Sequence, residues 1–144
     1  PLRSQADRQG LREAIAAGVV QAICSDHRPH ENAAKSRPFA ETEPGISSLE
    51  TMLPLSLRLV EDGLLDLPAM VRSLTVGPAE VLGLNSQGLV SGESADLLVF
   101  DPEKSWQVNE STLISAGKNT PFLGESMKGA VLTTIRKGTL VYQA

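Results

Sequence analysis

An acid and two histidines lie close together in the segment Ser-Asp-His-Arg-Pro-His at residues 25–30. A carboxylate such as Asp26 can bind a hard or borderline cation and can also carry a proton, and general acid–base catalysis of this kind accelerates reactions by roughly 10²–10⁴-fold. His27 and His30 could bind a metal, donate to a substrate or serve only in the loop. For Asp26 the structural alternative is a side chain that caps a turn.

The capacity of this sequence to bind a metal ion by itself is small. The chain contains two histidines and one cysteine. The spacing of Cys24, Asp26, His27 and His30 fits none of the common zinc patterns, and Cys24 is expected to be a small packing residue. A catalytic zinc ion usually has three protein ligands and a water, and a two-metal site needs more. We therefore do not expect a complete two-metal site from this chain alone.

A helix and an apolar run at residues 19–24 precede the acid and the histidines. Ser4 is the predicted N-cap of the helix, with Asp7 at the capping-box position, and Gly18 is the predicted C-cap after Ala17. A continuous apolar run entered from a helix is typical of a parallel strand that is buried on both faces. In α/β barrels the catalytic groups follow the carboxyl ends of such strands, so this order indicates an enzyme.

Residues 27–46 show no hydrophobic periodicity and contain three prolines. We expect a long loop, and loops of this length in compact domains are commonly functional; the alternative is a disordered excursion. Pro44 and Gly45 could bring backbone groups close to a ligand, or could only form the turn before the next helix. Three basic residues of the loop could attract an anionic substrate or a partner surface, or could simply be solvated: Arg28, Lys35 and Arg37.

Two helices and then a small β unit are predicted after this loop. Residues 47–50 read as a capping box for the first helix, which Pro54 should kink and Gly63 should end. Asp66 is the predicted N-cap of the second helix, which Gly77-Pro78 should break. Farther on, the sequence predicts short strands, of which the last two form a hairpin: residues 95–101, 130–135 and 139–142, with the turn around Lys137-Gly138.

The composition is that of an ordinary globular domain. The 144 residues carry a net charge of −4 and no basic cluster, so nucleic acid is not an expected partner. No apolar run approaches the ~20 residues that would cross a bilayer, so no membrane association is expected. A single cysteine fits a reducing cytoplasm. The start at Pro1 without a methionine suggests a fragment or a processed product.

Taken together, these residues resemble dihydroorotase, of the amidohydrolase superfamily. Residues 25–30 resemble the family's Asp-His-x-Pro-His motif, and residues 43–46 and 49–55 resemble the segment that follows it. Residues 92–97 and 119–124 resemble the family's tail. The similarity covers essentially the whole chain, but only the C-terminal part of the family's length.

The resemblance implies an α/β fold in two parts. Residues 1–84 would be the C-terminal part of a (β/α)8 TIM barrel, and residues 85–144 would be strands of a small β-sandwich domain. Such a sandwich would also take strands from the protein's N-terminus. Both parts of this chain should therefore expose unpaired strand edges and apolar surface.

The resemblance also implies a role for each candidate site residue. Asp26 would contact zinc and act as general base and then as general acid. His30 would hold a substrate carboxylate, and the backbone at Pro44 and Gly45 would line the substrate. The other zinc ligands would be an N-terminal His-x-His, a carboxylated lysine and two further histidines, in segments that this chain does not contain.

The implied activity is that of a zinc-dependent cyclic amidohydrolase, with this chain as an inactive C-terminal portion. The reaction would be the reversible cyclisation of N-carbamoyl-L-aspartate to dihydroorotate in pyrimidine biosynthesis. Arg28 departs from the family pattern, in which a small residue is usual. With residues 31–39, it is more similar to dihydroorotase-like chains that associate with aspartate carbamoyltransferase.

The alternative function is therefore a non-catalytic subunit that supports the assembly of aspartate carbamoyltransferase. The partners expected from the sequence are a small-molecule substrate, further copies of the same protein and, in the alternative, the carbamoyltransferase.

Overall fold

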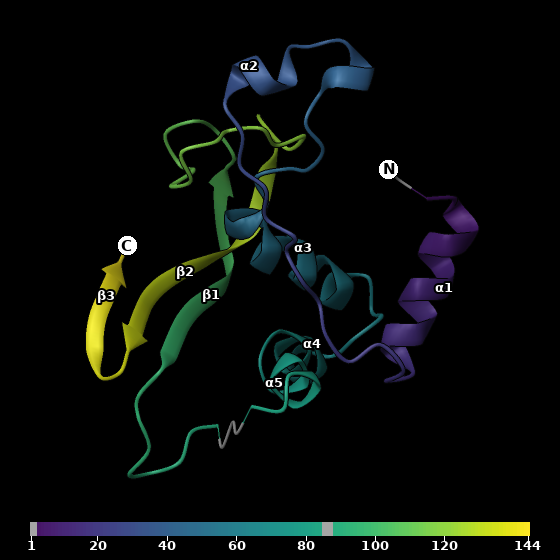
Figure 1. Cartoon of the computed structure of the whole chain (residues 1–144). Coiled ribbons are helices and arrows are strands. Elements are labelled where there is room, and N and C mark those ends of the chain that lie inside the picture. Colours follow the sequence, from purple (N-terminus) through teal and green to yellow (C-terminus); the bar gives the residue numbers. More distant parts are fainter. Residues whose placement is uncertain (1–2, 85–87) are drawn as a thin grey trace. The chain divides into compact units, whose positions relative to one another are not determined.

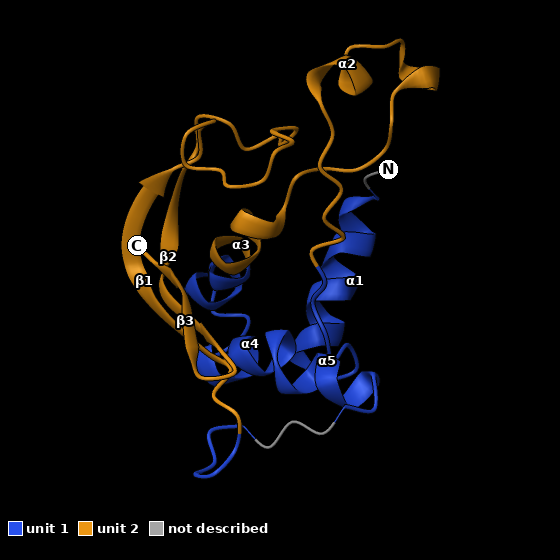
Figure 2. Cartoon of the chain, turned by 60° about the vertical axis from the view of Figure 1, so that its left-hand side comes forward, with its two compact units in different colours: residues 1–24, 56–93 blue, residues 25–55, 94–144 orange. Residues whose placement is uncertain are grey.

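The computed structural model describes residues 3–84 and 88–144, with helices mainly in the first part of the chain and strands in the last (Figure 1). The chain divides into two compact units (Figure 2). We call Pro1–Cys24 with Ser56–Glu93 the helical unit, and Ser25–Leu55 with Ser94–Ala144 the sheet unit. Within the described ranges, no helix is both long and apolar enough to span a membrane. The boundary expected near residue 85, between the barrel part and the β-sandwich part, stays a prediction.

The first helix of the helical unit, α1 (Gln5–Ala16), begins as the sequence predicts. The Ser4 hydroxyl accepts a hydrogen bond from the Asp7 N–H at 3.2 Å, and the Asp7 carboxylate accepts one from the Ser4 N–H at 3.1 Å. This reciprocal pair satisfies two N–H groups that the first turn leaves without a helical partner. Gly18 follows the helix in the left-handed region, with φ 73°. The predicted capping box and helix end are confirmed.

The helices α4 (Leu67–Leu74) and α5 (Val76–Val81) meet at Thr75. Asp66 caps α4 as predicted, because its carboxylate accepts the Ala69 N–H at 2.8 Å. The predicted break at Gly77-Pro78 is wrong by two residues. Both residues lie in the first turn of α5, where the N–H that proline lacks has no helical partner to lose.

The predicted strand at residues 19–24 is wrong for the described chain, since these residues form no regular secondary structure. They are held by the helices instead. The Ile23 N–H donates to the Ser73 carbonyl at 2.9 Å, and a Cβ added to Gly77 would lie 2.0 Å from the Gln21 carbonyl oxygen. A parallel strand forms only when neighbouring strands accept its hydrogen bonds, and residues 19–24 have no such neighbour among residues 3–84 and 88–144.

The long loop and the helix after it differ in detail from the prediction. Residues 27–46 contain two short helical turns, α2 (Asn32–Lys35) and the 3-10 helix η1 (Phe39–Glu41), so this segment is partly structured. The helix α3 (Leu49–Glu61) continues through Pro54. It ends before Gly63, as predicted, and the φ of Gly63 is 67°.

The sheet unit contains an antiparallel sheet in which β2 (Ser126–Arg136) pairs with β1 (Leu97–Gln107) on one side and with β3 (Thr139–Gln143) on the other. The predicted strands are confirmed, although β1 and β2 are longer than their apolar runs. Lys137 and Gly138 both have positive φ angles, 49° and 75°, as a tight hairpin turn requires. In its described residues the chain is thus α/β, with helices and a three-stranded antiparallel sheet.

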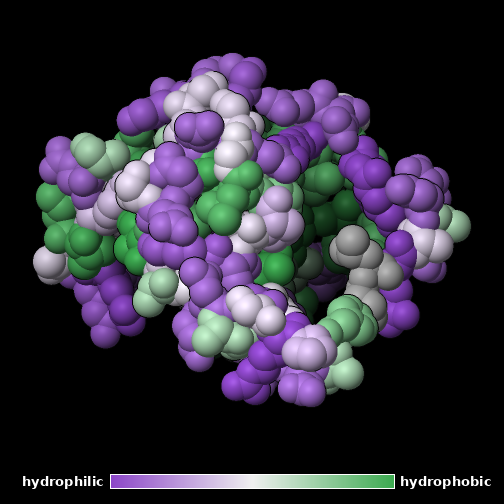
Figure 3. Space-filling view, turned by 90° about the horizontal axis from the view of Figure 1, so that it is seen from above, coloured by the Kyte–Doolittle hydropathy of each residue, from purple (hydrophilic) through white to green (hydrophobic). Residues whose placement is uncertain are grey.

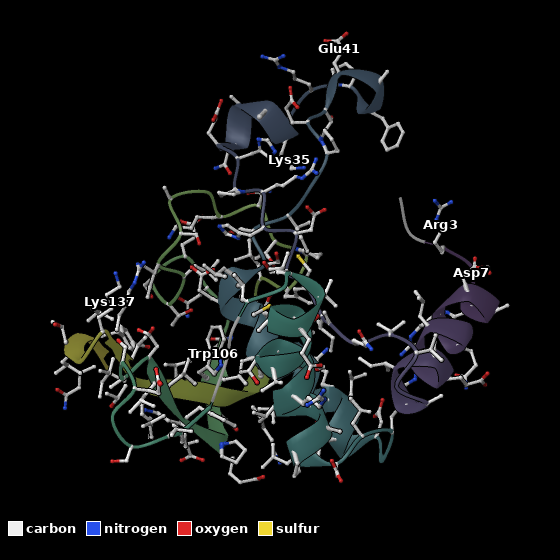
Figure 4. The ribbon with its side chains drawn as sticks, turned by 60° about the horizontal axis from the view of Figure 1, so that its bottom comes forward. Arg3, Asp7, Lys35, Glu41, Trp106 and Lys137 are labelled. Carbon is white, nitrogen blue, oxygen red and sulfur yellow. The ribbon has the colours of Figure 1, made fainter. Side chains whose placement is uncertain are left out.

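A small apolar core joins one end of the sheet to α3. Its buried members are Val108, Leu113 and Met127, against which Leu55, Trp106 and Phe122 pack. The Trp106 indole N–H donates to the Gly129 carbonyl at 3.0 Å, so the ring is held by β2 as well as by packing (Figure 4). This core positions the start of α3, from which the candidate site is built.

Apolar side chains also reach the molecular surface in several places (Figure 3). On the sheet, four aliphatic residues are each more than half exposed: Leu98, Val99, Leu140 and Val141. Exposed apolar surface of this kind is what the sequence analysis expects of a sheet that is completed by other strands.

Candidate functional site

Asp26 lies in the sheet unit with an unusual backbone conformation. Its φ is 41°, in the left-handed region, which costs about 1 kcal/mol or more for a residue other than glycine. Its side chain is 78% exposed, and the Arg28 Nε donates to its Oδ1 at 3.3 Å. Backbone strain of this kind persists only where the surroundings hold the residue in place.

Both neighbours of Asp26 are tied to the start of α3. The Ser48 hydroxyl donates to the Ser25 carbonyl at 2.7 Å. On the other side, the His27 Nδ1 accepts the N–H groups of Ser48 and Leu49, at 3.0 and 3.1 Å. The helix end therefore fixes the chain immediately before and after Asp26, and this accounts for its strained φ.

His27 is a helix cap. Because Nδ1 uses its lone pair to accept two backbone N–H groups, the neutral ring carries its proton on Nε2. That nitrogen lies 3.4 Å from the Ser115 hydroxyl oxygen, which accepts its N–H. Of the roles left open for His27, the structure supports the one in the loop: the ring satisfies the first N–H groups of α3, so its Nδ1 is not available to a metal ion.

The predicted capping box at residues 47–50 is wrong, because the ring of His27 accepts the first N–H groups of α3. The Ser47 hydroxyl is buried and has no hydrogen-bond partner in the described part of the chain. Glu50 reaches a different loop, and its Oε1 accepts the Ser115 N–H at 2.6 Å. Burial raises the pKa of Glu50, but the hydrogen bonds of Ser115, together with those of the Glu50 and Ile114 backbone, outweigh burial, so the pKa lies below its ordinary value.

His30 lies against the turn that contains Pro44 and Gly45. Its Nε2 is 3.2 Å from the Pro44 carbonyl oxygen, and since a carbonyl only accepts, Nε2 is the donor. In the neutral ring this leaves Nδ1 as an acceptor. Only the imidazolium form therefore offers a second N–H, at Nδ1, to an anion while Pro44 stays bound.

Arg28 lies between Asp26 and Gly45. Gly45 has φ 108°, and a Cβ added to it would lie 2.6 Å from the Arg28 Cβ. Glycine is therefore required at this position both by its conformation and by the close approach of Arg28. The structure thus brings Arg28, the departure from the family pattern, against two of the candidate site residues.

Lys35, at the end of α2 (Figure 4), supports the same turn from the other direction. Its ammonium group donates to the carbonyl oxygens of Glu43 and Gly45, the latter at 2.7 Å. The sequence left open attraction of an anionic substrate, attraction of a partner surface and simple solvation; the structure adds a contact within the chain. Its charge stabilises two loop carbonyls.

Sequence reasoning missed the role of Asn119, which joins the segments that carry the candidate residues. Its Oδ1 accepts the His30 N–H at 2.6 Å, and its Nδ2 donates to the Arg28 and Gly45 carbonyls at 3.0 and 3.2 Å. No local pattern connects residue 119 with residue 30. The only available signal was the position of Asn119 at the start of the family-like segment 119–124.

The residues of this chain do not make a zinc site by themselves. Across residues 3–84 and 88–144, no three His, Cys, Asp or Glu side chains are grouped so that they could hold a metal ion. The Nδ1 of His27 is committed to α3, and the Nε2 of His30 to Pro44. Asp26 could supply one ligand, and the other donors would have to come from residues outside this chain.

Comparisons with known proteins agree with the motif. The model of the amidohydrolase family matches residues 2–141. The chain is 51% identical over 143 residues to a dihydroorotase-like protein of Pseudomonas aeruginosa, and 46% identical over 144 residues to a dihydroorotase of Geobacter sp.. These matches cover 99% and 100% of this chain and 34% of each relative, so the chain spans about a third of the length of the curated relatives it matches.

The comparison with solved structures finds proteins of similar fold. L-hydantoinase (dihydropyrimidinase) from Arthrobacter aurescens matches with a TM-score of 0.88 and 32% identity, over 99% of this chain and 33% of that one. The inactive dihydroorotase-like domain of the Chaetomium thermophilum CAD-like multifunctional protein matches with a TM-score of 0.67 and 19% identity, over 96% of this chain and 36% of that one. Since a family model covers nearly all of its residues, the chain belongs to the amidohydrolase family.

Proposed function

We propose that the protein containing this chain is a dihydroorotase, a cyclic amidohydrolase that interconverts N-carbamoyl-L-aspartate and dihydroorotate. The observation that carries this proposal is the 3.2 Å contact between the His30 ring and the Pro44 carbonyl. It brings together two segments of the family-like motif that are separated along the chain. The relatives named dihydroorotase, at 38–46% identity, support the same activity.

The proposal also includes the architecture of the whole protein. We propose that residues 1–84 complete a (β/α)8 barrel and that residues 85–144 contribute strands to a β-sandwich. The TIM-barrel type of the hydantoinase relatives supports the first part, and the exposed aliphatic side chains of the sheet support the second. In that barrel, residues 19–24 would gain the strand neighbours that they lack here.

Asp26 is the proposed proton carrier. In the hydrolytic direction, a water oxygen adds to the cyclic amide carbonyl and the carbon–nitrogen bond breaks. Asp26 takes the proton from the water and delivers it to the leaving nitrogen. Zinc dependence is part of the proposal, and Asp26 is the one residue of this chain that we assign as a ligand.

His30 and Gly45 are the proposed substrate contacts. The imidazolium form of His30 can keep its Nε2 on Pro44 and donate from Nδ1 to a substrate carboxylate. In the described residues the Gly45 N–H has no hydrogen-bond acceptor, while its carbonyl already accepts from Lys35 and Asn119. The turn therefore offers a ligand a donor, which suits a carboxylate or a carbonyl oxygen.

A non-catalytic subunit that supports aspartate carbamoyltransferase assembly is the second candidate. The Arg28 guanidinium favours it, because it occupies the Asp26 carboxylate oxygen Oδ1, at 3.3 Å, that a metal ion or a substrate would otherwise contact. Two relatives named dihydroorotase-like protein, at 51% and 50% identity, agree with either function. Against this second candidate, Arg28 and Lys35 already have partners within the chain. Fewer basic side chains of the loop at 27–46 are therefore available to bind an acidic surface.

The test is turnover of dihydroorotate by the full-length protein and by two matched variants. Asp26 and Asp62 are both exposed aspartates that pair with an arginine. We expect Asp26→Asn to lower kcat by about 100-fold or more, with a much smaller change in KM, and Asp62→Asn to leave both unchanged. Wild-type kcat in Asp26→Asn would refute its assigned role. No turnover by a wild-type protein that binds aspartate carbamoyltransferase would favour the second candidate.

A further inference from the structure

We infer that Asn119 is a positioning residue that fixes the distance between His30 and Gly45. It sits between the two segments of the candidate site and is bonded to both. Its Oδ1 accepts the His30 N–H at 2.6 Å, while its Nδ2 donates to the Gly45 carbonyl at 3.2 Å. One side chain thus sets the position of both proposed substrate contacts.

The chemistry of the side chain is specific to an amide. The same residue must accept from His30 and donate to two carbonyls, those of Gly45 and Arg28. A carboxylate can only accept, and an aliphatic side chain does neither. The Asn119 backbone also takes part, because its carbonyl accepts the Ser47 N–H at 3.0 Å.

Gly117 supports the inference independently. It is buried, and a Cβ added to it would lie 2.4 Å from the His30 backbone nitrogen and 2.7 Å from the Pro29 carbonyl carbon. Any side chain at this position would therefore push the segment at 117–119 away from the turn at 29–30. The close approach that Asn119 uses depends on the absence of that side chain.

Gly45 is held from three sides, and this makes the consequence of losing Asn119 specific. The Gly45 carbonyl accepts from Asn119 and from Lys35, at 3.2 and 2.7 Å, and Arg28 packs against its Cα. Without Asn119, Lys35 still holds Gly45. Among the described residues, the two segments then keep the hydrogen bond from the Arg28 N–H to the Ile46 carbonyl at 2.8 Å and the His30 ring contact to Pro44, neither of which binds the His30 N–H. The separation of the two contacts then becomes variable, which weakens binding of a ligand that needs both.

Hydrogen exchange of individual amides tests this inference without assuming any activity. The experiment compares the full-length wild-type protein with Asn119→Ala, Asn119→Asp and Asn109→Ala. Asn109 is the matched control, because its amide holds a loop of the same unit through contacts to Ser111 and Thr112. In Asn119→Ala we expect the His30 amide to exchange about tenfold faster, because its N–H loses its acceptor. The amides of Arg28 and Ser47 keep their backbone acceptors, Ile46 and Asn119, and serve as internal references.

The Asn119→Asp variant separates positioning from general packing. It keeps the acceptor for the His30 N–H and loses both donors, at nearly the same volume. We expect the His30 amide to stay protected, while the carbonyl carbon resonances of Arg28 and Gly45 shift because these groups lose their Asn119 donor. Unchanged carbonyl resonances of Arg28 and Gly45 in Asn119→Asp, or unchanged exchange of His30 in Asn119→Ala, would overturn the inference, and so would effects of the same size in Asn109→Ala. If Asn119→Ala does not fold, Asn119→Asp carries the test.

The kinetic arm rests on the proposed function. For dihydroorotate we expect KM to rise about tenfold in Asn119→Ala, with kcat changed by less than about threefold, because a contact to the bound substrate is weakened and no reacting atom is touched. A fall in kcat with unchanged KM would overturn the positioning role. If the wild-type protein shows no turnover, the proposed function fails, whereas the exchange pattern still decides the role of Asn119.

Discussion

The His27 ring and Ser48 are joined by a hydrogen bond of 3.0 Å from the Ser48 N–H to the His27 Nδ1. Ser48 also donates, through its hydroxyl, to the carbonyl of Ser25 at 2.7 Å. One residue at the start of α3 therefore holds the chain on both sides of Asp26. The strained backbone of the proposed proton carrier is thus a consequence of how the helix begins.

Removal of the His27 ring should destabilise the start of α3. We expect His27→Ala to lower the free energy of unfolding by about 0.5–2 kcal/mol, the range for loss of a helix N-cap, and His27→Asn to recover part of that loss because asparagine is a good cap. Urea unfolding of the full-length protein measures both. Nitrogen NMR of the wild type should show an unprotonated Nδ1 and a protonated Nε2 for His27. The opposite tautomer would refute the cap.

The lowered pKa of Glu50 predicts a pH-dependent contribution to stability. A carboxyl whose folded-state pKa lies below its unfolded value stabilises the protein above the unfolded pKa, and this contribution is lost as the pH falls through the folded pKa. We therefore expect Glu50→Gln to destabilise the protein at pH 7 and to cost progressively less as the pH falls below the ordinary value of 4.5.

Unfolding midpoints at several pH values measure this effect. The exposed Glu41 on η1 (Figure 4) supplies the control, since Glu41→Gln removes a carboxylate that no such loop contact holds. A penalty for Glu50→Gln that is the same at pH 7 and at acidic pH would show that the hydrogen bond to Ser115 does not stabilise the ionised form.

The elements that could be predicted from sequence are those whose information lies within a few residues. The box of Ser4 and Asp7, the cap at Asp66 and the turn at Lys137-Gly138 each need only their own neighbours, and all are confirmed. The strand at 19–24 was predicted from its apolar residues alone. A strand also needs partners, and the described chain has none for it.

The candidate site could be located from sequence, but its supports could not. The motif singled out Asp26 and His30, whereas the residues that hold them come from far along the chain. The Ser48 N–H reaches His27 across 21 residues, and Asn119 reaches His30 across 89. No periodicity or capping rule connects such positions. For the same reason Glu50 was predicted to close its own helix, when its actual partner is Ser115.

His30 should determine selectivity for substrates that carry a carboxylate. A hydrogen bond to a charged group contributes roughly 1.5–3 kcal/mol, so His30→Ala should raise the KM for dihydroorotate by about 10- to 150-fold. Neutral cyclic amides, where they are turned over, should be little affected. Steady-state kinetics with both substrate classes checks this. Equal losses for both would mean that His30 only shapes the turn through its contact with Pro44.

The last prediction separates the two candidate functions by what covers the segment at 28–45. If the protein is a dihydroorotase, a small anionic ligand that contacts both His30 and Gly45 should make the segment between them more rigid. Proteolysis within residues 30–45 should then be slower. Glu41, exposed on η1 and followed by Thr42, gives a site for a glutamate-specific protease at which this can be followed. We expect dihydroorotate to protect the bond after Glu41 in the full-length protein, with measurable turnover.

The two functions also differ in the effect of Arg28. In the enzyme, Arg28→Ala removes the ion pair to Asp26 at 3.3 Å but leaves the proposed proton carrier in place, so turnover should persist. In an assembly subunit, Arg28→Ala and Arg37→Ala should chiefly slow association with aspartate carbamoyltransferase and reduce its salt dependence, since charges at the rim of an interface act mainly on association rates. Protection of the bond after Glu41 by the carbamoyltransferase and not by dihydroorotate, in a protein without turnover, would decide for the subunit. Only a protein surface would then cover a segment that the small molecule leaves open.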